Sequence, residues 1–121
     1  MFELTVIESF SAAHRIEGYA GNCSRMHGHN WRVELKVGAD KLDELNMAFD
    51  FRKAKAILIE ILEKFDHTVL NDNPILGGGN PTAERIAMII YRMAKEKLPE
   101  NIQIISVGVW ESDNACVVYS E

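Results

Sequence analysis

Residues 27–37 read HGHNWRVELKV. From Trp31 to Val37 an apolar side chain occupies every second position, and charged side chains fill the positions between them. Alternation with a period of two is typical of a β-strand that buries one face. Counting back from Trp31 in steps of two reaches His29 and then His27, so both imidazoles are expected on the buried face of this strand.

The rest of the chain divides into strand and helix patterns around this strand. The expected elements are a strand in the alternating segment 2–12, helices over 50–65 and 82–98, and strands over 102–110 and 115–119. The order strand, strand, helix, helix, strand, strand predicts an α+β fold, a single domain over residues 1–121 with a four-stranded antiparallel sheet and both helices on one face. The open edges of such a sheet predict pairing between copies of the chain into a larger, oligomeric barrel.

Composition excludes several classes of function. The net charge is −5, from 18 acidic and 13 basic residues, and no basic run is present, which argues against nucleic acid as a partner. No window approaches the roughly 20 apolar residues of a membrane helix, and the N-terminus has no leader pattern, so a cytoplasmic protein without a membrane partner is expected. Cys23 and Cys116 are the only cysteines and are expected to be free thiols.

A third histidine belongs with His27 and His29. His14 stands two positions beyond Ala12 on the expected inward face of the first strand, so the three rings converge if the first two strands are antiparallel neighbours. Three imidazoles without a fourth protein ligand are typical of a catalytic zinc site, whose open position holds water or substrate. Iron, copper and nickel remain alternatives. Three separate, hydrogen-bonded histidines at strand ends are the structural alternative.

Cys23 lies four residues before His27, in a loop that also contains Arg25. A thiol beside a bound cation ionises more readily and is then a base or nucleophile. An ordinary loop thiol is an equally good interpretation.

Two further acidic positions are candidates for the site. Asp66 and His67 are expected at the end of the first helix, either as an acid–base pair or as a favourable histidine at a helix C-terminus. Glu111 shares a face with Val109 and Val107, which makes it an inward carboxylate. A ligand with two adjacent N–H donors, such as the amino-pyrimidinone edge of a pterin, is one partner for it, and an internal salt bridge is another.

Together these residues resemble the 6-pyruvoyl-tetrahydropterin synthase family, and more narrowly its 6-carboxytetrahydropterin synthase branch. The matching motifs are Phe10-Ser-Ala-Ala-His14-Arg15, Cys23-Ser-Arg-Met-His27-Gly-His29, Phe65-Asp66-His67, Leu70-Asn-Asp72, Asn80-Pro-Thr-Ala-Glu84 and Glu111. The Cys-to-His segment is the most specific of them, and its three-residue gap is similar to the carboxy-forming branch.

The resemblance implies a tunnelling fold (T-fold), in which trimers close a barrel and stack as hexamers with active sites between subunits. It implies that His14, His27 and His29 bind zinc and that Cys23 is the proton-abstracting thiolate. The other site residues that it implies are Asp66 and His67 for proton transfer, Glu111 as the pterin anchor, and Thr82 and Glu84 as further substrate contacts.

The expected reaction is the zinc-dependent conversion of 7,8-dihydroneopterin triphosphate to 6-carboxy-5,6,7,8-tetrahydropterin, a lyase reaction that releases acetaldehyde and triphosphate. Arg15 and Arg25 are candidates for contacts with the triphosphate. The alternatives are the pyruvoyl-forming reaction without acetaldehyde, a zinc hydrolase acting on another substrate, and a non-catalytic pterin-binding oligomer. Queuosine-type deazapurine synthesis and biopterin synthesis both remain open as the pathway.

Overall fold

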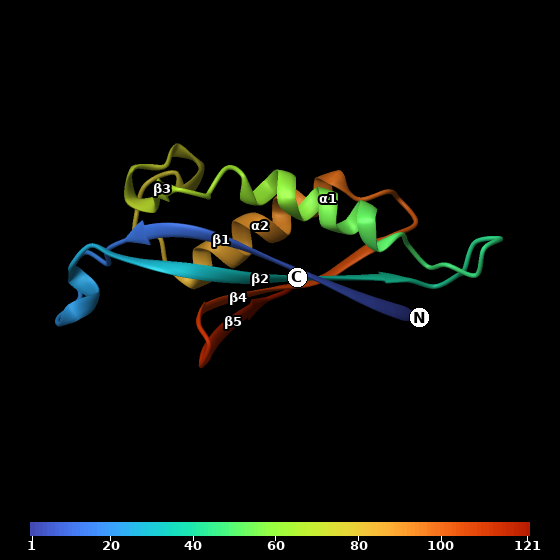
Figure 1. Cartoon of the computed structure of the whole chain (residues 1–121), viewed down its shortest axis with the longest axis horizontal. Helices are drawn as coiled ribbons and strands as arrows, with labels where there is room; N and C mark the ends of the chain where they lie inside the picture. Colours follow the sequence, from blue (N-terminus) through green and yellow to red (C-terminus); the bar gives the residue numbers. More distant parts are fainter.

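The computed structural model describes residues 1–121, with the exception of the side chain of Asn22. The elements are β1 (Phe2–His14), β2 (His27–Ala39), α1 (Phe51–Leu62), β3 (Thr68–Val69), α2 (Ala83–Lys97), β4 (Gln103–Ser112) and β5 (Ala115–Tyr119), with short 3-10 turns over Asn22–Ser24, Leu70–Asp72 and Pro74–Leu76. One sheet has the strand order β3-β1-β2-β4-β5, and α1 and α2 lie on the same side of it (Figure 1). The predicted α+β fold and its order of four long strands and two helices are confirmed.

The sheet has one strand more than predicted. β3 has two residues and pairs parallel to β1 at Ala12 and Ala13, whereas all other neighbours are antiparallel. A two-residue strand is too short to produce an alternating pattern, which is why the sequence did not indicate it. The first helix also ends earlier than predicted, at Leu62, so Asp66 and His67 lie in the turn between α1 and β3 rather than at the helix terminus.

The two helices begin at side-chain caps that the sequence contains. The carboxylate of Asp50 accepts a hydrogen bond from the backbone N–H of Arg52 at 2.8 Å, as predicted. The hydroxyl of Thr82 accepts one from the N–H of Arg85 at 3.2 Å. Such caps satisfy backbone donors that the first helical turn leaves without partners.

The core lies between the helices and the inward face of β1, β2 and β4. Trp31 and Phe65 are fully buried there, and Phe10 stacks on Trp31 with ring centroids 5.8 Å apart. The indole N–H of Trp31 donates to the carbonyl of Ala12 across the strand pair at 3.2 Å.

Replacing Leu58 with alanine is expected to lower the free energy of unfolding by about 2–5 kcal/mol, because this α1 side chain is 0% exposed and its removal leaves a cavity. The neighbouring Ile59 is 43% exposed, and Ile59→Ala should change stability by less than about 0.5 kcal/mol. Urea unfolding of the two variants tests this, and equal losses would contradict the one-sided burial of α1.

Both long edges of the sheet are open. β5 has a neighbour on one side only, and the outer edge of β1 is paired only at Ala12 and Ala13. The single chain therefore forms an open sheet, and a closed barrel would need further copies. Among the described residues, no helix combines the length and the apolar character that crossing a lipid bilayer requires.

Candidate metal centre and active site

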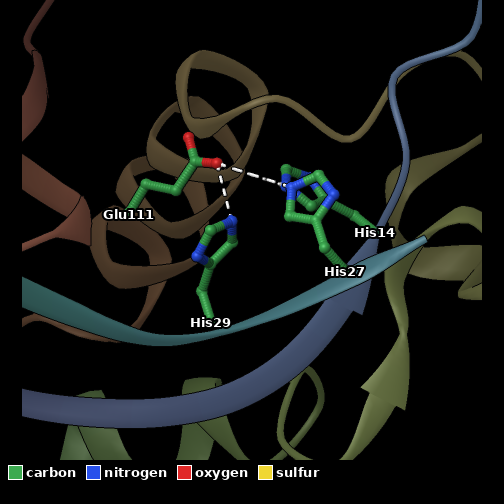
Figure 2. A group of neighbouring side chains, drawn as sticks. All are labelled: His14, His27, His29 and Glu111. Carbon is green, nitrogen blue, oxygen red and sulfur yellow. Dashed lines mark ion pairs between the residues drawn. The ribbon is translucent and has the colours of Figure 1, made fainter. Parts of the chain in front are cut away.

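The pairing of β1 with β2 brings the three predicted histidines together. His14 lies directly opposite His27, and Ala12 lies opposite His29, so His14 and His29 are diagonal neighbours on one face. The ring centroid of His14 lies 4.6 Å from that of His27 and 5.4 Å from that of His29, and the ring centroids of His27 and His29 are 4.7 Å apart. The predicted convergence is confirmed, at the end of the sheet where the β1–β2 hairpin opens into its loop (Figure 2).

Backbone carbonyls set which ring nitrogen faces the site. The Nδ1 atom of His14 lies 2.8 Å from the carbonyl oxygen of Pro81, and that of His27 lies 2.7 Å from the carbonyl oxygen of Arg25. Since a carbonyl only accepts, both Nδ1 atoms carry the proton, and the Nε2 lone pairs are left for the interior of the group. This is the orientation that a metal-binding imidazole receives from its outer hydrogen-bond partner.

A carboxylate completes the group, which the sequence predicted to have no fourth protein donor. Oε1 of Glu111 lies 2.8 Å from Nε2 of His29, 3.4 Å from that of His14 and 3.9 Å from that of His27 (Figure 2). One atom from each of these four residues can be chosen so that all lie within 4.8 Å of one another.

The donor set fits a zinc ion. Nε2 of His14 and Nε2 of His29 are buried and have no hydrogen bond of acceptable geometry, although Glu111 is only 2.8 Å from the latter. Buried acceptors that face one another and a carboxylate are unfavourable unless a cation lies between them. Three imidazoles with one oxygen donor are a common zinc set, so His14, His27 and His29 would hold the ion.

Burial, together with the neighbouring His27 and His14, lowers the pKa of His29 below its ordinary value of 6.5, although Glu111 opposes this shift. Because the unfolded chain then takes up the proton at a higher pH than the folded one, metal-free protein should lose stability as the pH falls below about 6.5. Urea unfolding of metal-free wild type and His29→Gln from pH 8 to pH 5 measures the part due to this residue. A wild-type advantage that grows toward acid pH would contradict the expectation.

Asp66 and His67 form the pair that the sequence predicted. Oδ2 of Asp66 lies 2.9 Å from Nδ1 of His67, and Oδ1 accepts a hydrogen bond from the backbone N–H of Ser11 at 2.9 Å. The Ser11 bond, followed by the interaction with His67, lowers the pKa of Asp66, so the group is a carboxylate at neutral pH. Nδ1 of His67 therefore carries a proton toward Asp66, and its Nε2 faces away from that carboxylate.

The backbone of His67 adopts a left-handed conformation, with φ of 57°, that non-glycine residues seldom adopt. Its N–H donates to the carbonyl of Ser11 at 2.6 Å, which holds it at the sheet edge beside a groove of about 470 Å³. The strand order separates this edge from β4, which carries Glu111, and the four-residue metal group includes neither Asp66 nor His67.

The loop between β1 and β2 carries three predicted residues. Cys23 is an exposed free thiol outside the metal group, and its carbonyl accepts a hydrogen bond from the N–H of Ile16 at 2.7 Å. The guanidinium of Arg15 lies 3.0 Å from the carboxylate of Glu17, and the side chain of Arg25 is exposed. All three side chains are exposed.

Thr82 and Glu84 stand at the start of α2, next to Pro81. The hydroxyl of Thr82 is already engaged as the helix cap, and the carboxylate of Glu84 is exposed in the first turn. The carbonyl of the preceding Pro81 contacts the imidazole of His14, although the two residues are 67 positions apart in the chain.

Two asparagines that sequence reasoning did not assign a role hold this corner together. The side-chain amide of Asn71 exchanges two hydrogen bonds with the backbone of Arg15, at 2.9 and 3.0 Å, and that of Asn80 exchanges two with the backbone of Glu17, at 2.8 and 2.9 Å. Their amides pair with the backbone just after β1, as a neighbouring strand would, and Asn80 directly precedes Pro81, which contacts His14. Their presence in the quoted motifs was a signal, but their partners lie 56 and 63 residues away along the chain.

Comparisons with known proteins show related sequences and the same fold. The curated 6-carboxy-5,6,7,8-tetrahydropterin synthase of Synechocystis is 39% identical over 93 residues, which are 73% of this chain and 70% of that protein. The Bacillus subtilis protein of the same name is 32% identical over 126 residues, which are 98% of this chain and 84% of that protein. The solved structure of Caenorhabditis elegans 6-pyruvoyl tetrahydropterin synthase shares the fold with a TM-score of 0.84, at 24% identity, over 99% of this chain and 95% of that one.

The family described as 6-pyruvoyl tetrahydropterin synthase matches residues 3–121, which include the three histidines, Asp66, His67 and Glu111. Together with the two curated relatives, this match covers the sheet, both helices and the whole metal group. The chain therefore belongs to the 6-pyruvoyl tetrahydropterin synthase family, whose members are lyases.

Proposed function

We propose that the chain is a zinc-dependent 6-carboxytetrahydropterin synthase, which converts 7,8-dihydroneopterin triphosphate to 6-carboxy-5,6,7,8-tetrahydropterin with release of acetaldehyde and triphosphate. The observation that carries the proposal is the group of three imidazoles whose Nε2 atoms face one point in a chain of this family. The names of the curated relatives support the carboxy-forming branch.

The candidate site residues have separate roles in the proposed reaction. His14, His27 and His29 would hold a zinc ion, which would supply Lewis-acid polarisation to an oxygen of the substrate side chain. Cys23, an exposed thiol in the loop between β1 and β2, takes the proton from the adjacent carbon. His67, oriented by Asp66, returns a proton through its Nε2.

The remaining polar groups bind the substrate. Glu111 accepts the paired N–H groups of the pterin ring, and Thr82 and Glu84 contact the substrate from the start of α2. Arg15 and Arg25 meet the triphosphate, because the chain has a net charge of −5 and the phosphates need local cationic donors.

The proposal includes an oligomer built from trimers, with six chains and active sites between subunits. The open outer edges of β1 and β5 support it, since unpaired strand edges are satisfied by a second copy. Asp66 and His67 lie at the β3 edge of the sheet, so the pair would serve the metal group of a neighbouring chain. Light scattering on the purified protein tests the assembly, and a monomer would contradict it.

The decisive experiment is incubation of zinc-loaded protein with 7,8-dihydroneopterin triphosphate and identification of the products by mass, with metal-stripped protein as the control. We expect the 6-carboxy product and one acetaldehyde per turnover. A pyruvoyl product without acetaldehyde would assign the chain to the reaction that the family description names. The absence of any conversion would refute both. Cytoplasmic queuosine biosynthesis is the setting that we propose for the carboxy-forming reaction.

A further inference from the structure

Glu111 owes its direction to an irregularity in β4. Trp110 pairs with Cys116 of β5 and Ser112 pairs with Ala115, so the register shifts between them and Glu111 has no residue opposite it. On the other side, the pairing of β4 with β2 ends at Trp110. An unpaired residue of this kind bends the strand and re-aims its side chain. The bend turns the carboxylate of Glu111 toward the three histidines (Figure 2).

The contacts of that carboxylate with His14 and His27 favour a cation between them. Because the Nδ1 atoms of His14 and His27 donate to carbonyls, their Nε2 atoms are acceptors, and so is each oxygen of an ionised carboxylate. Oε1 of Glu111 nevertheless lies within 3.9 Å of all three Nε2 atoms, and His14 is 1% exposed. A metal ion among the four atoms removes the repulsion and satisfies each donor.

The same carboxylate is accessible from outside. The side chain of Glu111 is 36% exposed, whereas that of His14 is 1% exposed. The four donors therefore range from the buried His14, through His27 and His29 at 29% and 25% exposure, to the acidic arm of Glu111, which is the most exposed.

We infer that Glu111 is the fourth metal ligand of the substrate-free protein and that an incoming ligand displaces it. Without substrate, the carboxylate of Glu111 completes the coordination of the ion. When substrate binds, this carboxylate leaves the ion and accepts the N–H groups of the substrate ring. One coordination position is then free for the side chain of the substrate. The second half of this inference rests on the proposed function, whereas the first half depends only on the metal group.

Cobalt(II) binding tests the first half, because the visible spectrum of cobalt reports the number and type of its ligands. We expect Glu111→Gln to weaken cobalt binding at least about tenfold in competition with a chelator and to change the spectrum. Glu111→Asp, which keeps the charge on a shorter arm, should give an intermediate affinity.

Glu34→Gln is the matched control. Glu34 is a partly buried carboxylate on the neighbouring strand β2, but it accepts a hydrogen bond from the indole N–H of Trp110 at 3.1 Å and lies 3.6 Å from Arg32. Its removal changes the net charge by the same amount and should leave cobalt affinity at the wild-type value. Equal affinities and equal spectra for Glu111→Gln and Glu34→Gln would overturn the inference. If Glu111 only anchors the pterin, Glu111→Gln should raise KM without changing metal affinity.

Addition of 7,8-dihydroneopterin triphosphate to cobalt-loaded wild type tests the displacement. We expect the spectrum to change on binding, and an unchanged spectrum with bound substrate would overturn this half. The two failures are distinguishable. If no product forms but Glu111→Gln weakens cobalt binding, the proposed reaction is wrong, and Glu111 is still a metal ligand. If product forms and Glu111→Gln binds cobalt like wild type, only the fourth ligand is wrong.

Discussion

Replacing Cys23 with alanine is expected to lower turnover about 10²- to 10⁴-fold while zinc content stays at the wild-type level. The thiol lies outside the four-residue metal group, so its loss removes no ligand. It stands on the loop that begins after His14 and ends before His27, and its backbone is tied to Ile16, so the loop should keep its shape. Metal analysis and product formation on the same preparation measure the two effects.

Cys116→Ala is the control for Cys23→Ala. Partial burial, with a smaller contribution from Glu34, raises the pKa of Cys116, so this thiol stays protonated near neutral pH and is a poor base. Its removal should leave turnover unchanged. Turnover that survives in Cys23→Ala would remove this residue from the mechanism and favour a hydrolase-type reaction, for which the thiol is dispensable.

His27→Ala is expected to reduce zinc affinity more than a hundredfold and to abolish turnover at ordinary zinc concentrations, because it removes one of the three proposed imidazole ligands. Loss of an outer hydrogen-bond partner alone costs about ten- to a hundredfold in metal affinity. The side chain of His27 is 29% exposed, so the variant should fold. Chelator competition gives the affinity, and circular dichroism of the metal-free protein checks the fold.

Arg25→Ala tests whether the side chain of Arg25 contributes to zinc binding by His27. The group that holds Nδ1 of His27 is the backbone carbonyl of residue 25, which alanine retains. Zinc affinity should therefore remain at the wild-type value, while KM rises if the guanidinium contacts the triphosphate. Wild-type zinc affinity in His27→Ala would show that the metal, if bound, lies elsewhere.

The local pattern of the chain was sufficient to predict its four longer strands and two helices, but not β3 or the end of α1. Period-two alternation in 27–37 identified β2 and the face of His27 and His29, and apolar side chains at helical spacing identified α1 and α2. Asp50 marked the start of α1 because a capping side chain acts on its own turn. These features depend on neighbours within a few positions, so the sequence contains them directly.

The metal group itself was decided by packing between distant segments. That His14 lies opposite His27 depends on the register of two strands, and a shift by one residue would turn His14 to the other face. The short β3 and the amide bridges from Asn71 and Asn80 join residues far apart in the chain. The irregularity at Glu111 lies within the β4–β5 hairpin, but the histidines that this carboxylate meets come from two other strands. Local periodicity says which face a side chain occupies, but only the folded register says which side chain it meets there.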